Sequence, residues 1–211
     1  MILTEKEIIF LTSVSRGRAP LGVTYTLPPE TKRRQYIEET LQKLREKNLV
    51  DQEGNLTMDG ACLVRLWEEY RNGNFHFAIN KTFFMPVGDS YLMMLSKIED
   101  KYMFQWIQSE LLLLELMQQA EALRLGEKEP FRGKWTGIED VELFLEQITE
   151  SILIREYHKG KLQSEKAYVW KEKQGYLINL KKKRIRKLSV GYIRKQICQM
   201  VMGETENEGR E

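Results

Sequence analysis

The sequence predicts an α+β protein with a mostly antiparallel sheet flanked by helices. One observation is a helix, helix, hairpin, helix order over residues 2–72. The other is an αβββα order that occurs twice, in residues 59–125 and 138–202, with equivalent elements about 75–80 residues apart. This spacing predicts a pseudo-twofold repeat whose halves share one sheet, behind a winged-helix-like N-terminus.

Composition restricts the class of protein. The chain has 211 residues, with 33 Lys+Arg against 31 Asp+Glu and a net charge of +2. This is ordinary globular composition, which excludes wholesale disorder, collagen-like repeats and coiled-coil rods. No apolar run approaches the roughly 20 residues of a membrane span, and no leader-like segment opens the sequence. We therefore expect a soluble cytoplasmic protein without membrane insertion.

The cysteines agree with a reducing compartment. Only Cys62 and Cys198 occur, each within a helix-like pattern. We expect free buried thiols, with a disulfide between them as the alternative.

The first helices are marked by local signals. Thr4 and Glu7 have the spacing of a capping box, which predicts a helix from residue 5. Pro28-Pro29 is expected to start a second helix. Its apolar positions fall on one face and are expected to be buried: Ile37, Leu41 and Leu44.

A small hairpin and a third helix follow. Leu49-Val50 and Leu56 flank a polar, Gly-containing turn, which predicts a hairpin. Thr57 is expected to cap a helix that ends near Arg71. This order of elements is typical of a winged-helix module.

Such a module raises the possibility of DNA binding through the second helix. The helix begins with Lys32, Arg33 and Arg34, but acidic residues interrupt its basic positions: Glu30, Glu38, Glu39 and Glu46. Mixed signs favour a solvated face, because a phosphate-binding face gains from continuous positive charge. A winged-helix transcription regulator, with residues 73–202 as sensor or dimer domain, remains the alternative function.

Residues 73–202 are expected to be the α+β remainder, packed with the first part. Strands are predicted near residues 75, 90 and 101 in the first half and near 151, 166 and 176 in the second. Ser109 and Ser189 are expected to cap helices that reach about residues 125 and 202. A helix over residues 137–149 follows a loop over residues 126–137. The acidic residues 203–211 are expected to be a disordered tail.

No catalytic or metal-binding pattern is present. The sequence lacks the Walker A, Gly-x-Gly-x-x-Gly and Gly-x-Ser-x-Gly motifs. His76 and His158 have no cysteine or second histidine at ligand spacing. We therefore predict a protein that is not an enzyme and has no cofactor or metal.

Two stretches are candidate partner-binding sites. Lys181 through Lys187 is strongly basic, which suits an acidic partner or nucleic acid, although a solvated loop and helix start is the alternative. Phe83-Phe84-Met85 and Trp135 are large apolar residues in loop-like contexts, which suit an apolar partner helix unless they are buried in the core. The candidate residues are Phe83, Phe84, Met85, Trp135, Lys181, Lys182, Lys183, Arg184 and Arg186. The apolar run Leu111–Leu114 at the start of its helix is expected to be buried or docked.

The order of elements resembles a known family. Three features are similar to EspG-type proteins of ESX (type VII) secretion. They are the helix start Leu3-Thr4-x-x-Glu7, the stretch with Leu49-Val50-Asp51-x-x-Gly54 and Asp59-Gly60, and the two βββα halves. The resemblance covers residues 2–202. It implies a cytoplasmic bacterial chaperone that binds a small helical secreted protein and keeps it soluble. No binding residue of the family is carried over, and the oligomeric state stays open.

Overall fold

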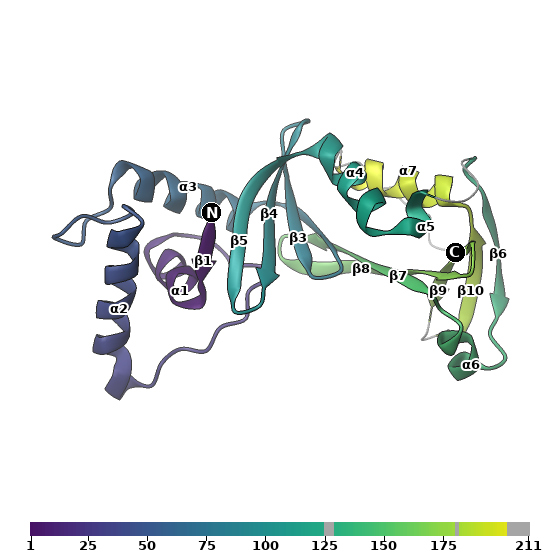
Figure 1. The fold of residues 1–211 in the computed structure, drawn as a ribbon, viewed down its shortest axis with the longest axis horizontal. Coiled ribbons are helices and arrows are strands. Elements are labelled where there is room, and N and C mark those ends of the chain that lie inside the picture. Colours follow the sequence, from purple (N-terminus) through teal and green to yellow (C-terminus); the bar gives the residue numbers. More distant parts are fainter. Residues whose placement is uncertain (125–128, 180–181, 202–211) are drawn as a thin grey trace. The chain divides into compact units, whose positions relative to one another are not determined.

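The computed structural model describes residues 1–124, 129–179 and 182–201 (Figure 1). Its strands form a ten-stranded antiparallel sheet in the order β1-β5-β4-β3-β2-β7-β8-β9-β10-β6. The strands are β1 (Ile2–Thr4), β2 (Phe75–Ile79), β3 (Thr82–Val87), β4 (Tyr91–Ile98), β5 (Lys101–Gln108), β6 (Arg132–Gly137), β7 (Glu150–His158), β8 (Lys161–Lys171), β9 (Gln174–Asn179) and β10 (Arg184–Leu188). The α-helices are α1 (Glu5–Val14), α2 (Arg33–Glu46), α3 (Met58–Asn72), α4 (Ser109–Gln119), α5 (Glu121–Arg124), α6 (Val141–Glu146) and α7 (Val190–Val201). The expected α+β class is confirmed.

The described chain divides into two compact units. The first contains Met1–Asn74, Lys81–Phe83 and Met94–Gln105. The second contains Phe75–Asn80, Phe84–Met93 and the described residues from Trp106 onward. The first unit thus combines the predicted winged-helix-like part with pieces of β3, β4 and β5. A winged-helix domain bounded at residue 72 stays a prediction, and the predicted tail, residues 203–211, lies outside the described residues.

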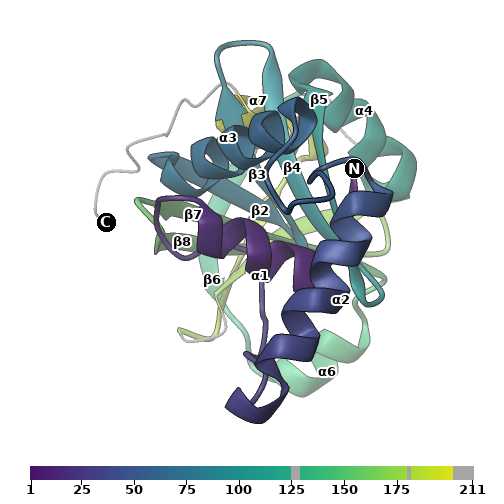
Figure 2. The same ribbon diagram turned by 90° about the vertical axis from the view of Figure 1, so that its left-hand side faces the viewer.

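Helix α1 of the first unit, labelled in Figure 2, begins with a feature that the ribbon does not draw, the predicted capping box. The backbone N–H of Thr4 donates to Glu7 Oε2 at 2.6 Å, and the Thr4 hydroxyl accepts from the N–H of Glu7 at 3.4 Å. Glu7 is fully buried, and its other carboxylate oxygen lies 2.6 Å from Lys47 Nζ. Because a buried charge is costly without a partner, this ion pair ties α1 to the end of α2.

Helix α2 corrects two expectations. It begins at Arg33, after a 3₁₀ turn over Glu30–Lys32, and not at the two prolines. Ile37 is 55% exposed, whereas Thr40 and Leu44 are buried. Leu44 is thus buried as expected and Leu41 is half-buried, whereas Ile37 is outside the inward stripe. Tyr36 is half-buried in its place, with Lys6 Nζ of α1 5.0 Å from the centroid of its ring.

The predicted hairpin reduces to one bridge, Val50 to Leu56, and α3 follows it. The Thr57 hydroxyl accepts from the N–H of Gly60 at 3.1 Å, so the predicted N-cap is confirmed. Helix α3 brings two aromatic residues, Trp67 and Tyr70, into the core of the unit. Both pack edge-on against Phe104 of β5, with ring centroids 5.4 and 5.7 Å away.

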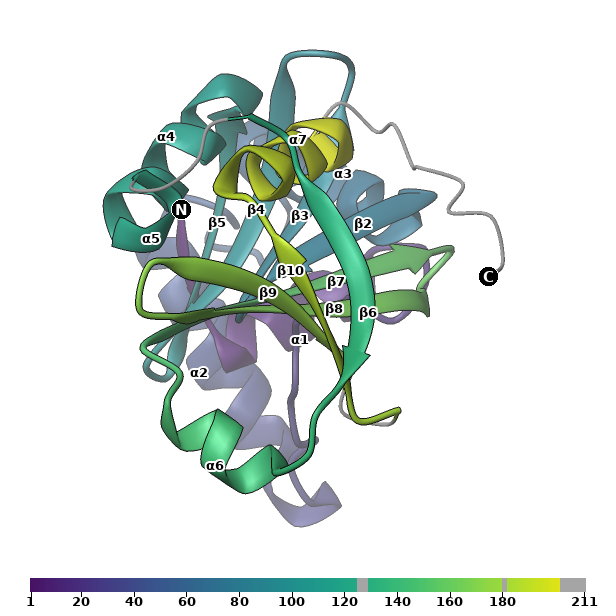
Figure 3. The same ribbon diagram turned by 90° about the vertical axis from the view of Figure 1, so that its right-hand side faces the viewer.

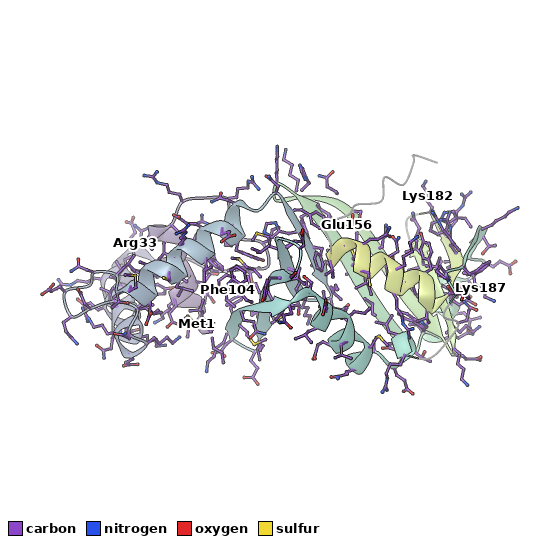
Figure 4. The ribbon with its side chains drawn as sticks, turned by 90° about the horizontal axis from the view of Figure 1, so that it is seen from above. Met1, Arg33, Phe104, Glu156, Lys182 and Lys187 are labelled. Atoms are coloured by element: carbon purple, nitrogen blue, oxygen red, sulfur yellow. The ribbon has the colours of Figure 1, made fainter. Side chains whose placement is uncertain are left out.

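Strand β1 joins the sheet by pairing with β5. Leu3 lies opposite Tyr102, and the amino group of Met1 donates to the carbonyl of Phe104 at 2.8 Å (Figure 4). Leu3 is completely buried, so this three-residue strand contributes to the core as well as to the sheet edge.

In the second unit, α4, α5 and α7 lie over one face of β7–β10, and α6 lies on the opposite side (Figure 3). Large side chains fill the helix-covered face: Ile152, Ile154, Tyr168, Trp170 and Leu188 are buried. A Cβ at Gly175 of β9 would lie only 3.4 Å from Ile193 Cδ1 of α7, which marks the close approach of helix and sheet. The Ser189 hydroxyl accepts from the N–H of Tyr192, which confirms the predicted N-cap of α7.

Several expected boundaries after residue 72 are wrong. Each half contains four strands, β2–β5 and β7–β10, and not three. Strand β6 replaces part of the predicted loop, and β10 lies where a loop and helix start were expected. Helix α4 stops at Gln119 and α6 covers only Val141–Glu146. Ser109 is the first residue of α4, and no side chain caps that helix.

Candidate partner-binding surface

The apolar candidates on β3 lie in a strand and not in the predicted loop. Phe84 and Met85 are 3% and 4% exposed, and the ring of Phe84 stacks on Phe77 with centroids 5.1 Å apart. Phe83 is half-buried, and its ring fills the space where a Cβ at Gly22 would lie. These side chains are used for packing within their units, which leaves Phe84 and Met85 inaccessible to a partner.

Trp135 lies on β6 and not in a loop. It pairs with Arg186 of β10, and the guanidinium of Arg186 lies 4.5 Å from the centroid of the Trp135 ring. Arg186 is 6% exposed and Trp135 is half-buried. The structure thus brings together two candidates that are 51 positions apart in the sequence, as a cation–π pair inside the protein.

The remaining basic candidates are exposed. Lys182 and Lys183 lie in the turn before β10, Arg184 begins that strand, and Lys181 lies outside the described residues. Two further exposed lysines extend the group, Lys187 on β10 and Lys134 on β6. Figure 4 shows Lys182 and Lys187 at the same end of the second unit, with their side chains directed outward.

We call Lys134, Lys182, Lys183, Arg184 and Lys187 the cationic edge. Among the described residues, none of its members forms an ion pair with a carboxylate. Within the described residues, these charges are therefore not neutralised by a carboxylate.

A second exposed surface lies on α4. Leu111 and Leu114, three residues apart on one side of the helix, are 50% and 53% exposed, whereas Leu112 is buried. We call Leu111 and Leu114 the α4 apolar face. The sequence indicated that this run would be buried or docked, but it did not separate the two leucines that face outward.

An aromatic pair lies close to the start of α4. Tyr91 of β4 and Trp106 of β5 are 45% and 42% exposed, and their rings pack edge-on with centroids 6.1 Å apart. The N–H of Ser109, the first residue of α4, donates to the carbonyl of Ser90 at 2.9 Å. Helix α7, by contrast, turns its apolar residues inward, and Lys195 is its one exposed residue.

The candidate DNA-binding residues form a mixed-charge surface on α2. Arg33 lies 3.3 Å from Glu30, and Arg34 lies 3.0 Å from Glu38 (Figure 4). Lys32 is exposed. These pairs are of the i,i+3 and i,i+4 kind expected for a solvated helix, so the structure gives the DNA-binding alternative no support.

No metal site is formed within the described ranges. These residues contain no group of three or more His, Cys, Asp or Glu side chains that could hold a metal ion. His76 is buried on β2, and His158 is exposed at the end of β7. Across the same ranges, no helix has the length and apolar character to cross a membrane.

Comparison with solved structures identifies the class of fold. The chain is similar to the type VII secretion system chaperone EspG5 of Mycobacterium tuberculosis, solved in complex with a PE25–PPE41 dimer. The TM-score is 0.54 at 8% sequence identity, and the match covers 100% of this chain and 98% of EspG5. Identity this low shows a common fold alone. The EspG-like fold implied by the resemblance is thereby supported.

The family is shown by sequence. Residues 2–207 match the model of the family described as "Domain of unknown function (DUF5081)", and the chain belongs to this family. No curated protein matches the chain.

Proposed function

We propose that the chain is a non-enzymatic, chaperone-like factor of type VII secretion that binds a small helical secreted protein. The observation that carries this proposal is the fold, which is shared over the whole chain with a chaperone solved in complex with a protein dimer. Because a fold alone does not determine function, the proposal needs a surface that suits such a partner.

The α4 apolar face offers that surface. A helix on the outside of a protein usually presents polar residues to water, and neighbouring exposed leucines are typical of an interaction site. Leu111 and Leu114 are both about half exposed. An amphipathic partner helix could cover them with its own apolar side chains, as in other helix-binding proteins.

The test is purification of the tagged full chain from its native cell, followed by mass spectrometry. We expect one small helical protein to copurify and to remain bound in about 1 M salt, where exposed charges are screened but apolar contacts persist. Leu111→Glu with Leu114→Glu should remove this protein. Leu162→Glu, at a leucine on β8 that is 52% exposed, is the matched control and should retain it. Circular dichroism of each variant separates lost binding from lost folding.

The DNA-binding alternative predicts a different outcome. The chain would recover nucleic acid and no protein, with affinity that falls steeply as salt rises. Charge reversal of Lys32, Arg33 and Arg34 to Glu would then abolish binding. Recovery of nucleic acid without a protein would contradict the proposed function. So would a protein partner that still copurifies after both α4 substitutions.

A further inference from the structure

Strand β6 is an edge strand of the described sheet. It is the last strand of the sheet and pairs only with β10 among the described strands. The N–H of Ile138 donates to the carbonyl of Lys183 at 2.9 Å, so the backbone groups of Ile138 face β10. In an antiparallel pair this direction alternates from residue to residue. The N–H and C=O groups of Trp135 and Gly137 therefore face away from β10, where an added strand could pair with them.

The same edge has two neighbouring lysines. Thr136 pairs with Ile185, and the register then shifts between Arg186 and Leu188. A Cβ at Gly133 would lie 3.5 Å from Lys187 Cβ, so Lys187 packs against the residue next to Lys134. Lys134 and Lys187 are therefore neighbours on adjacent strands. Both are exposed, and no described carboxylate pairs with either of them. Like charges on adjacent strands repel each other. An anionic group beside the two lysines would attract both of them and so offset their mutual repulsion.

We propose that β6 binds an extended acidic segment of a protein partner by strand addition. Backbone groups of the segment would pair with Trp135 and Gly137, and its carboxylates would lie beside Lys134 and Lys187. The inference rests on the proposed function only for the presence of a protein partner. It adds a second contact, separate from the α4 apolar face, and assigns the chemistry of the segment that makes it.

The geometry disfavours other occupants. If a second copy of the chain paired through the same strand, its Lys134 would lie near this Lys134, and the two positive charges would repel each other. Lysines at sheet edges hinder pairing between identical strands in this way. Nucleic acid would gain from aromatic stacking, but the ring of Trp135 is covered by Arg186. Backbone pairing at a strand edge is also a property of peptides and not of phosphate groups.

The experiment uses the full chain and a fluorescein-labelled heptapeptide of alternating threonine and glutamate. Fluorescence anisotropy should show saturable binding. Lys134→Glu with Lys187→Glu should weaken it at least about tenfold, since both attractive charges become repulsive. Lys159→Glu with Lys161→Glu, an equal charge change at the β7–β8 turn, should alter affinity less than about twofold.

A second probe separates strand addition from simple charge attraction. The same peptide with alternate residues N-methylated keeps its carboxylates but cannot donate the backbone hydrogen bonds. We expect its binding to be lost. Equal affinity for the two peptides would overturn the proposal, as would tighter binding of a fluorescein-labelled DNA duplex at the same salt concentration.

Two further results would assign another occupant and overturn the proposal. One is a dimer in sedimentation that dissociates on Lys134→Glu. The other is a tenfold or greater gain in peptide affinity when the four glutamates of residues 203–211 are changed to glutamine, because the chain's own tail would then compete. If Lys134→Glu with Lys187→Glu retains the copurified partner at full yield, this inference fails while the proposed function stands.

Discussion

At the scale of single residues, Arg71 is a polar anchor of the first unit. Its side chain is 7% exposed and donates to the carbonyls where α1 ends and the next loop begins. The acceptors are the carbonyls of Thr12, Ser15, Gly17 and Arg18 and the hydroxyl of Ser15. Burial lowers the pKa of the Arg71 guanidinium from its ordinary value. The protein therefore uses a partly desolvated cation to satisfy several backbone carbonyls at once.

We predict that Arg71→Ala destabilises the protein by about 3 kcal/mol, because several buried carbonyls lose their donor together. The control is Arg65→Ala on the same helix, where the side chain is exposed and a change within about 0.5 kcal/mol is expected. Urea unfolding monitored by tryptophan fluorescence measures the free energy of unfolding of both variants. Equal midpoints for the two variants would show that Arg71 is not an anchor.

The two cysteines are predicted to differ in reactivity. Both are free thiols, as expected from the sequence; Cys62 is exposed, so its expected burial is wrong, and Cys198 is half-buried. Burial raises the pKa of the Cys198 thiol, so less of it is thiolate at any pH below that pKa. A short iodoacetamide pulse at pH 8 should therefore label Cys62 at least about tenfold faster, as read by peptide mass spectrometry. Labelling at equal rates would contradict the burial of Cys198.

At the scale of elements, the sequence predicted best where a local signal fixes the structure. Thr4, Thr57 and Ser189 each mark a helix start, because a hydroxyl that accepts from an N–H of the first turn favours a helix there. Strands β6 and β10 were missed for the opposite reason. Both sequences are rich in cations and β6 carries glycine at two positions, and what makes them strands is pairing with segments that are not visible locally: β6 with β10, and β10 with β9 as well.

The candidate surface was predictable only in part. Charge is visible in sequence, so Lys182, Lys183 and Arg184 were found, and they are exposed. Burial depends on the neighbouring strands, so Phe84 and Met85, buried on consecutive positions of β3, could not be separated from exposed residues by periodicity. Lys134 became a candidate only once β6 was placed beside β10.

Gly60 of α3 gives a prediction that opposes helix propensity. Alanine normally stabilises a helix interior relative to glycine. Here an added Cβ would overlap the carbonyl oxygen of Leu49, because α3 packs directly on that backbone. We expect Gly60→Ala to cost about 2 kcal/mol or more, as overpacking does. The neighbouring exposed position is the control: Ala61→Gly should cost only about 1 kcal/mol of helix propensity. A stabilising Gly60→Ala, in thermal unfolding, would contradict the close approach.

At the scale of the whole molecule, corresponding hairpins of the two halves share an unusual turn conformation. Residues with positive φ occur in the β2–β3 and β7–β8 turns, at Asn80 and Lys159, and in the β4–β5 and β9–β10 turns, at Glu99 and Lys183. Gly88 in the β3–β4 turn and Glu172 in the β8–β9 turn form the third pair. The sheet order is also symmetrical about the β2–β7 pair. Lysine and glutamate rarely adopt this conformation, so the shared pattern agrees with the predicted pseudo-twofold repeat.

The symmetry places β7 at the centre and β6 at an edge, which predicts different amide exchange in the two strands. In β7, pairing with β2 on one side and β8 on the other should slow exchange at consecutive residues such as Ile154 and Arg155. In β6, exchange should alternate: Thr136 and Ile138 slow, Trp135 and Gly137 fast. Exchange measured by NMR on the free chain would test this. Equal protection of Trp135 and Thr136 would mean that the outer side of β6 is already covered, and an acidic strand could then not be added there.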